Sequence, residues 1–159
     1  MRKSLTIAVL IFFCLAGAGA EARVADSRIA MGGINPGSTE AYVKRTYGPP
    51  KEVRRTYYEP RGQYIREYNY GDSFFIAVLE NSGTVLYMMS LGRHNKIATI
   101  DGITVGSTLE AVLAAYGYPD LRQIDGDTDY YWYMGSGDKG NLVFHISFGR
   151  VTGIVCGGR

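Results

Sequence analysis

The residue types that carry most enzymatic chemistry are scarce in this chain of 159 residues. It has two histidines, His94 and His145, and two cysteines, Cys14 and Cys156. His145 lies in an apolar run that predicts a strand, and His94 lies in a segment between predicted strands. Ser90 is near His94 in sequence, but a catalytic triad is defined by geometry in space. No G-x-S-x-G motif is present. We therefore expect no enzymatic activity and no cofactor.

Three alternating carboxylates, Asp125, Asp127 and Asp129, raise the question of a calcium site. An EF-hand loop needs Gly at its sixth position and Glu at its twelfth. Tyr130 and Ser136 stand at those places. Asp and Gly also favour turns between strands, so we expect a polar turn without a metal, and the calcium alternative stays open.

Aromatic residues are a stronger signal, with 13 Tyr, 6 Phe and 1 Trp. The densest run is 130–133, where alternation along a strand puts Tyr130 and Trp132 on one face and Tyr131 and Tyr133 on the other. Tyr, Trp and Arg are enriched at binding hot spots, although aromatic residues also favour strands in general. We expect a protein partner to contact an aromatic set with flanking arginines: Tyr68, Tyr70, Tyr131, Trp132, Tyr133, Arg54 and Arg55.

Charge is distributed unevenly although the net charge of the chain is only +2. Residues 44–66 carry seven basic and two acidic residues, whereas residues 120–138 carry five Asp and one Arg. These segments are two solvated surfaces, or surfaces by which one copy attracts the other, or contacts for a partner of complementary charge. The small net charge gives no reason to expect a nucleic acid or an anionic membrane as partner.

An internal repeat organises the chain. Residues 33–39 return as 102–108 at an offset of 69 residues, and Gly48 and Pro50 return as Gly117 and Pro119. Each copy predicts a helix of about three turns that ends at its glycine. The N-cap residues expected from the sequence are Ser38 and Ser107.

Strands follow each predicted helix, and the short turns between them indicate antiparallel pairing. The expected fold class is α+β, with two tandem repeats that each pack an N-terminal helix on a three- or four-stranded antiparallel meander. The first repeat covers residues 23–91, a connector covers 92–98, and the second repeat covers 99–159. The expected strands are 51–58, 64–70, 74–80, 85–91, 121–124, 130–134, 142–148 and 151–156.

The N-terminus predicts export. A positive start at residues 1–3 precedes an apolar stretch and two overlapping A-x-A sites, which is typical of a signal peptide over residues 1–22. An uncleaved anchor is the alternative, although the apolar stretch is shorter than the roughly 20 residues of a membrane span. Cys14 lies inside this stretch and is not expected to carry a lipid. We expect an exported chain, periplasmic or secreted, with no stable membrane insertion after cleavage.

The repeat resembles a known family. Gly-Ser-Thr, a short helix that ends in Tyr-Gly-x-Pro, and a tyrosine-rich strand followed by a strand ending in Phe-Gly-Arg-Val resemble the SmpA/OmlA (BamE-like) domain. The pattern also resembles the tandem fold of the β-lactamase inhibitor protein. In the second copy the matching residues are 102–119 and 131–151. The resemblance implies non-catalytic work in the cell envelope, either in outer-membrane assembly or in holding a protein on the sheet surface.

The sequence therefore predicts a non-catalytic, exported protein-binding module of the cell envelope. Two alternatives remain open. The first is a structural subunit of an envelope complex. The second is a binder of small molecules or cell-wall glycans that uses an aromatic sheet face.

Overall fold

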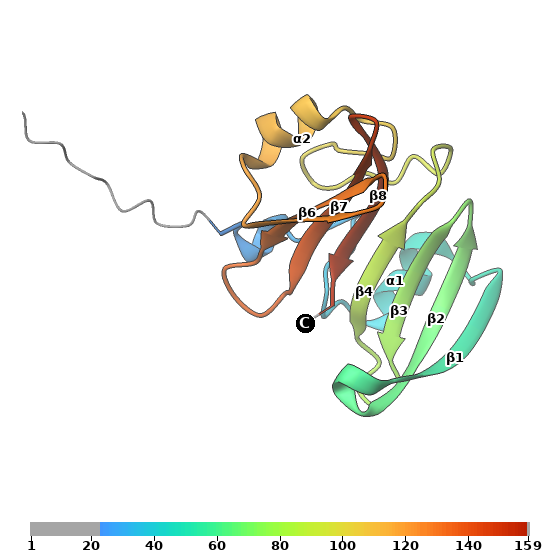
Figure 1. Ribbon diagram of the computed structural model, residues 1–159. Helices are drawn as coiled ribbons and strands as arrows, with labels where there is room; N and C mark the ends of the chain where they lie inside the picture. Colours follow the sequence, from blue (N-terminus) through green and yellow to red (C-terminus); the bar gives the residue numbers. More distant parts are fainter. Residues whose placement is uncertain (1–22, 159) are drawn as a thin grey trace, which may run out of the picture.

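A computed structural model describes residues 23–158, which form one antiparallel sheet of eight strands with two α-helices (Figure 1). The expected signal peptide, residues 1–22, lies outside the described residues. The order of strands across the sheet is β1-β2-β3-β4-β8-β7-β6-β5. The elements are η1 (Asp26–Arg28), α1 (Glu40–Tyr47), β1 (Glu52–Tyr58), η2 (Glu59–Arg61), β2 (Gln63–Gly71), β3 (Phe74–Leu79), β4 (Val85–Ser90), α2 (Leu109–Tyr116), β5 (Leu121–Asp125), β6 (Thr128–Met134), β7 (Asn141–Ser147) and β8 (Arg150–Gly157).

The fold class predicted from the sequence is wrong. The prediction divides the strands between two tandem units, each with its own meander. The structure instead joins all eight strands in one sheet. The joining contact is the antiparallel pairing of β4 with β8, in which Met88 lies opposite Cys156 and Ser90 opposite Ile154. We call this β4–β8 pairing the seam. It links residues that are more than 60 positions apart in the sequence and have no local pattern in common.

Both helices are capped one residue later than the sequence predicts. The side chains of Thr39 and Thr108 accept hydrogen bonds from the backbone N–H groups of Tyr42 and Ala111, so threonine is the N-cap in each case. The expected caps, Ser38 and Ser107, instead accept from backbone N–H groups three residues earlier and close the preceding turns. Each helix has eight residues, about two turns instead of three.

The two helices end as the sequence predicts. The N–H of Gly48 donates to Lys44 and that of Gly117 donates to Leu113. Both glycines have φ near +75°, a conformation that side chains strongly disfavour. The turn residues at these positions therefore fix where the chain leaves each helix.

The core lies between the helices and one face of the sheet. A row of neighbouring residues crosses this face at the centre of the sheet, and all of its members are buried: Tyr68, Ile76, Met88, Cys156, Leu142 and Tyr133. Tyr47 of α1 packs on Phe74, and Tyr116 of α2 packs on Phe144. The helices thus cover one face of the sheet and leave the other for the functional site. No helix among residues 23–158 is both long and apolar enough to cross a membrane.

Candidate functional site: the open face of the sheet

The face of the sheet that points away from the helices carries its own row of apolar side chains. We call it the open face. Successive strand residues point to opposite faces, so the neighbours of the buried row belong to it. Across six strands the aligned residues are Phe75, Met89, Val155, Val143, Trp132 and Leu121. In Figure 1 α1 lies behind β3 and β4, so the viewer looks onto the open face of these strands.

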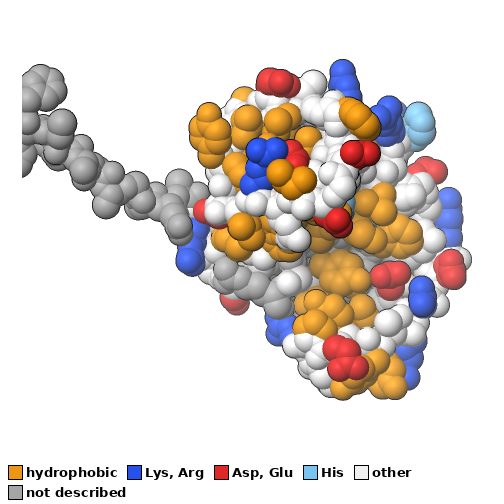
Figure 2. Space-filling model, in the orientation of Figure 1, with side chains coloured by type: hydrophobic (Ala, Val, Ile, Leu, Met, Phe, Trp, Pro, Cys, Tyr) orange, Lys and Arg blue, Asp and Glu red, His pale blue; other side chains and the backbone are white. Residues whose placement is uncertain are grey.

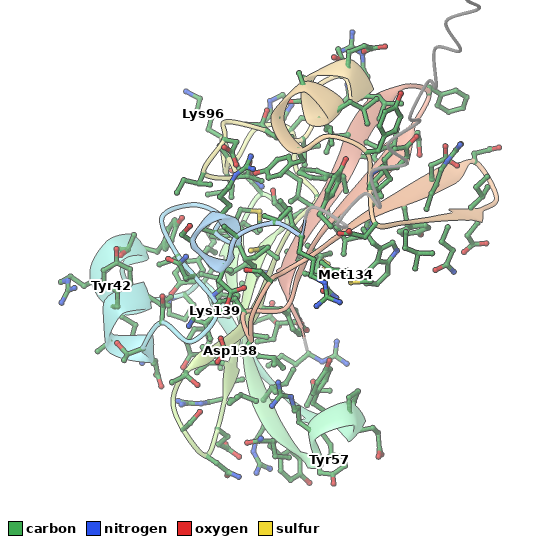
Figure 3. All side chains as sticks on the ribbon, turned by 90° about the vertical axis from the view of Figure 1, so that its left-hand side faces the viewer. Tyr42, Tyr57, Lys96, Met134, Asp138 and Lys139 are labelled. Atoms are coloured by element: carbon green, nitrogen blue, oxygen red, sulfur yellow. The ribbon has the colours of Figure 1, made fainter. Side chains whose placement is uncertain are left out.

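A hollow of about 400 Å³ lies on the open face and spans the seam. Figure 2 shows hydrophobic side chains gathered across the middle of this face. In profile, the two halves of the sheet diverge from the region of Asp138 and Lys139, with Met134 on one arm and Tyr57 on the other (Figure 3). The lining residues come from both halves of the sheet: Tyr58, Tyr87, Met89, Tyr130, Trp132, Val143, His145, Val155, Gly157 and Gly158.

The aromatic walls of the hollow are held by contacts with one another. The rings of Tyr130 and His145 meet edge to face at 4.7 Å between centroids, and those of Tyr58 and Tyr87 lie 6.4 Å apart. The Tyr87 hydroxyl donates to Glu67 at 3.1 Å. These contacts restrict the movement of the rings that line the hollow.

Two titratable groups in the walls, Tyr87 and His145, have pKa values shifted towards the neutral form. Burial raises the pKa of Tyr87 well above its usual value, and the adjacent Glu67 carboxylate raises it further. Burial also lowers the pKa of His145 below 6.5. At neutral pH Tyr87 and His145 therefore present uncharged rings to the hollow.

The tyrosines expected to bind a partner have different positions in the structure. Tyr68, Tyr131 and Tyr133 are buried on the helix-covered face and belong to the core. Tyr70 is half-buried beside the ring of Tyr47. Trp132 alone of these aromatic residues lines the hollow. Of the five expected aromatic residues, the structure thus brings only Trp132 to the hollow, and three of the others belong to the core.

The two expected arginines lie on opposite sides of the edge strand β1. Arg54 belongs to the open face, opposite Glu67 of β2. Arg55 points to the other side, where it forms a salt bridge of 2.8 Å with Glu80 and lies over the ring of Tyr64. Both arginines are exposed, but they cannot flank the same contact.

Several residues of the hollow lie outside the set expected from the sequence. Tyr130 could have been included, because alternation places it on the same face as Trp132. His145 is opposite Tyr130 in the register of β6 and β7, but that register depends on three-dimensional pairing. Tyr58, Tyr87 and Met89 come from the other side of the seam and reach the hollow only through the joined sheet.

Apart from His145, the residues considered for catalysis or metal binding lie outside the lining of the hollow. Cys156 is fully buried at the seam, where burial raises its pKa to about 12. His94 is exposed in the connector. Asp129 is joined to Arg122 by a salt bridge of 2.5 Å. Among residues 23–158 no group of three or more His, Cys, Asp or Glu side chains is placed to hold a metal ion.

Comparisons with known proteins give only distant likenesses. No family model and no curated protein matches the chain, so the resemblance to the SmpA/OmlA family is not confirmed. Similar solved structures include a DUF4309 family protein from Bacillus subtilis, with 13% identity, coverage of 77% of this chain and 79% of that chain, and a TM-score of 0.43. A putative β-lactamase inhibitor protein from Streptococcus mutans has 13% identity, coverage of 72% and 78%, and a TM-score of 0.29.

A third similar structure is an extracellular protein with an SCP domain from Bacillus anthracis. It has 10% identity and a TM-score of 0.46, and the match covers 99% of this chain but 50% of that chain. This chain therefore spans about half the length of that protein. None of the three TM-scores reaches 0.5. The function is consequently inferred from the residues of this chain.

Proposed function

We propose that the chain is a non-catalytic, exported module that binds another protein on the open face of its sheet. The observation that supports this most directly is the aromatic hollow across the seam. A protruding apolar side chain of a partner would displace water from it and gain the hydrophobic free energy of burial. Export is part of the proposal and depends on the N-terminal sequence pattern.

The lining of the hollow matches the composition of binding hot spots. Tyr58, Tyr87, Tyr130 and Trp132 supply large rigid rings with few rotatable bonds, so ordering them costs little entropy. Ring contacts between Tyr58 and Tyr87, and between Tyr130 and His145, hold three of these rings in position before a partner arrives. A preorganised aromatic surface of this kind favours recognition of a partner with a complementary apolar projection.

The proposal can be tested with the single tryptophan of the chain as a built-in probe. Because Trp132 lines the hollow, an occupant of the hollow changes the surroundings of the indole. Proteins captured from the producer's envelope or medium by the exported chain are purified and titrated against it. We expect a shift in the emission of Trp132 that saturates with the amount of partner.

Variants locate the contact surface. Trp132→Ala and Tyr130→Ala remove rings from the hollow and should weaken capture at least tenfold, consistent with hot-spot losses above about 1.4 kcal/mol. Tyr118→Ala is the matched control, because Tyr118 is an exposed aromatic residue outside the hollow. Circular dichroism spectra of all variants confirm folding. Capture that persists in both hollow variants would place the partner on another surface.

A small ligand is the second candidate for the same hollow. Its volume and its largely apolar aromatic lining also match sites for small molecules. Titration with cell-wall glycans, followed by Trp132 emission and thermal unfolding, separates the two candidates. Saturable binding of a glycan in the absence of any protein would favour the small-ligand function.

A further inference from the structure

The sheet is open at both ends. β1 and β5 are its end strands, and each has a hydrogen-bonded neighbour on one side only. All five residues of β5 and six of the seven in β1 are exposed. Unpaired N–H and C=O groups along such an edge are a template for another strand.

Two features that commonly block edge pairing, proline and a β-bulge, are missing from these two strands. Neither contains a proline. Each keeps an uninterrupted register with its neighbour, seven pairs for β1–β2 and five for β5–β6, so no bulge bends the edge away. Each of the other six strands has a hydrogen-bonded neighbour on both sides.

The segments around the two edge strands differ in charge, although β5 itself has one Arg and one Asp. Residues 51–55, at the start of β1, contain three basic residues and one acidic residue. Residues 120–127, which include β5, contain three Asp and one Arg. Among the described residues, Arg54 and Asp125 form no salt bridge. Like charges disfavour the pairing of an edge with its own counterpart, whereas opposite charges favour β1 with β5.

The directions of the strands suit this pairing. Every neighbouring pair in the sheet is antiparallel. Across eight strands the two end strands therefore run in opposite directions. A second copy placed beside the first, with its helices on the same side, continues the antiparallel alternation when its β1 meets β5.

We propose that β1 of one copy pairs with β5 of a second copy and extends the sheet from chain to chain. One antiparallel register uses all five residues of β5 and keeps each side chain on its own face. It sets Arg54 opposite Asp125 and Arg55 opposite Ile124. The remaining opposed pairs are Thr56 with Gln123, Tyr57 with Arg122, and Tyr58 with Leu121.

This register brings together groups that are solvent-exposed in a single chain. Leu121 is 49% exposed and Tyr57 is 46% exposed. Burial of Leu121 against Tyr58 removes apolar surface from water, and the guanidinium of Arg122 can lie on the ring of Tyr57. The contact joins different surfaces of two copies, so it repeats and produces an assembly whose size grows with concentration.

Two charge reversals test the pairing. The chain is expressed with residues 1–22, recovered after export and studied by sedimentation velocity across a concentration series. The wild type should show an average mass that increases with concentration. Arg54→Asp puts two carboxylates opposite one another, and Asp125→Arg puts two guanidinium groups opposite one another. We expect each variant alone to remain monomeric at concentrations where the wild type associates.

Mixing the two variants restores association, because each edge then meets an edge of opposite charge. Arg45→Asp is the control, since it makes the same charge change on exposed α1 and should associate as the wild type does. A wild type that stays monomeric at every concentration would overturn the proposal. Single variants that associate undiminished, or a mixture that stays monomeric, would also overturn it.

Discussion

The two helices lie on the same sheet in different ways. At an offset of 69 residues, Glu40 and Lys44 of α1 correspond to Leu109 and Leu113 of α2. Glu40 accepts hydrogen bonds from Arg66 at 2.5 Å and from Tyr68 at 2.6 Å, and Lys44 forms a salt bridge to it at 2.6 Å. At these two positions α1 is therefore held by ion pairs and a hydrogen bond.

α2 is attached by apolar contact at the matching positions. Leu109 and Leu113 pack against the core cluster, as do Ala111 and Ala115. One aromatic contact is shared by both helices, since Tyr47 and Tyr116 each pack on a phenylalanine of the sheet. Equivalent positions of two helices on the same sheet can thus be stabilised either by an ion network or by hydrophobic burial. Only the ion network makes stability depend on pH at this position.

The aromatic contact shared by both helices predicts the largest effect. Phe74→Ala and Phe144→Ala each remove a buried ring and should lower the free energy of unfolding by about 3–5 kcal/mol. Because the seam joins the two halves, we expect each variant to show a single urea transition at a lower midpoint. Two separate transitions in either variant would show that the halves unfold independently.

The charged attachment of α1 predicts the next largest effect. Glu40→Gln removes the anion that Arg66 and Lys44 contact, leaving charged donors poorly paired in a partly buried place, and should cost about 1–3 kcal/mol. Urea unfolding at pH 7 measures this loss of unfolding free energy. Glu110→Gln is the matched control, because Glu110 is exposed in the first turn of α2. An equal loss in both variants would contradict a special role for Glu40.

The same carboxyl predicts a pH dependence. Burial alone would raise the pKa of Glu40, but hydrogen bonds from Lys44, Tyr68 and Arg66 outweigh it and lower the pKa from 4.5 to about 2. A lowered pKa contributes stability above pH 4.5 that is lost as the pH falls towards 2. The difference in unfolding free energy between wild type and Glu40→Gln should therefore shrink over this range. A difference that stays constant down to pH 2 would assign the effect to packing.

The helix caps predict the smallest effect, and here the two halves should agree. Thr39→Ala and Thr108→Ala each remove one hydrogen bond to a backbone N–H and should cost about 1 kcal/mol. The matching Thr→Ser variants keep the hydroxyl and should stay within a few tenths of a kcal/mol of wild type. Thermal unfolding measures both pairs. A much larger loss in one helix would show that its cap also supports tertiary contacts.

Local pattern in the sequence predicted the strands well. β1, β3 and β4 begin or end within one residue of the ranges expected from alternation and turn residues. The helix ends at Gly48 and Gly117 were also predicted, because the chain leaves each helix with a positive φ that glycine adopts readily. The caps were misplaced by one residue because serine and threonine stand side by side and either side chain can accept from a backbone N–H.

The joined sheet and the hollow could not be predicted in the same way. The seam pairs Met88 with Cys156, and no turn or local motif connects them. Alternation also cannot say which face of β6 the helices cover, because Tyr131 and Tyr133 on one face are as aromatic as Tyr130 and Trp132 on the other. The covered face is decided by α2, whose Tyr116 packs on Tyr133. Only three-dimensional packing separates the core tyrosines from those of the hollow.

Cys156 provides a way to measure how often the seam opens. Its thiol is buried between neighbours on β4 and β7, and its raised pKa leaves it almost entirely protonated at neutral pH. A thiol reagent can therefore modify it only in moments when β8 separates from the sheet. The rate of modification reports how often β8 separates from the sheet, while Trp132 emission reports on the hollow in the closed state. With these two natural probes, the opening of the joined sheet can be measured in a chain without substitutions.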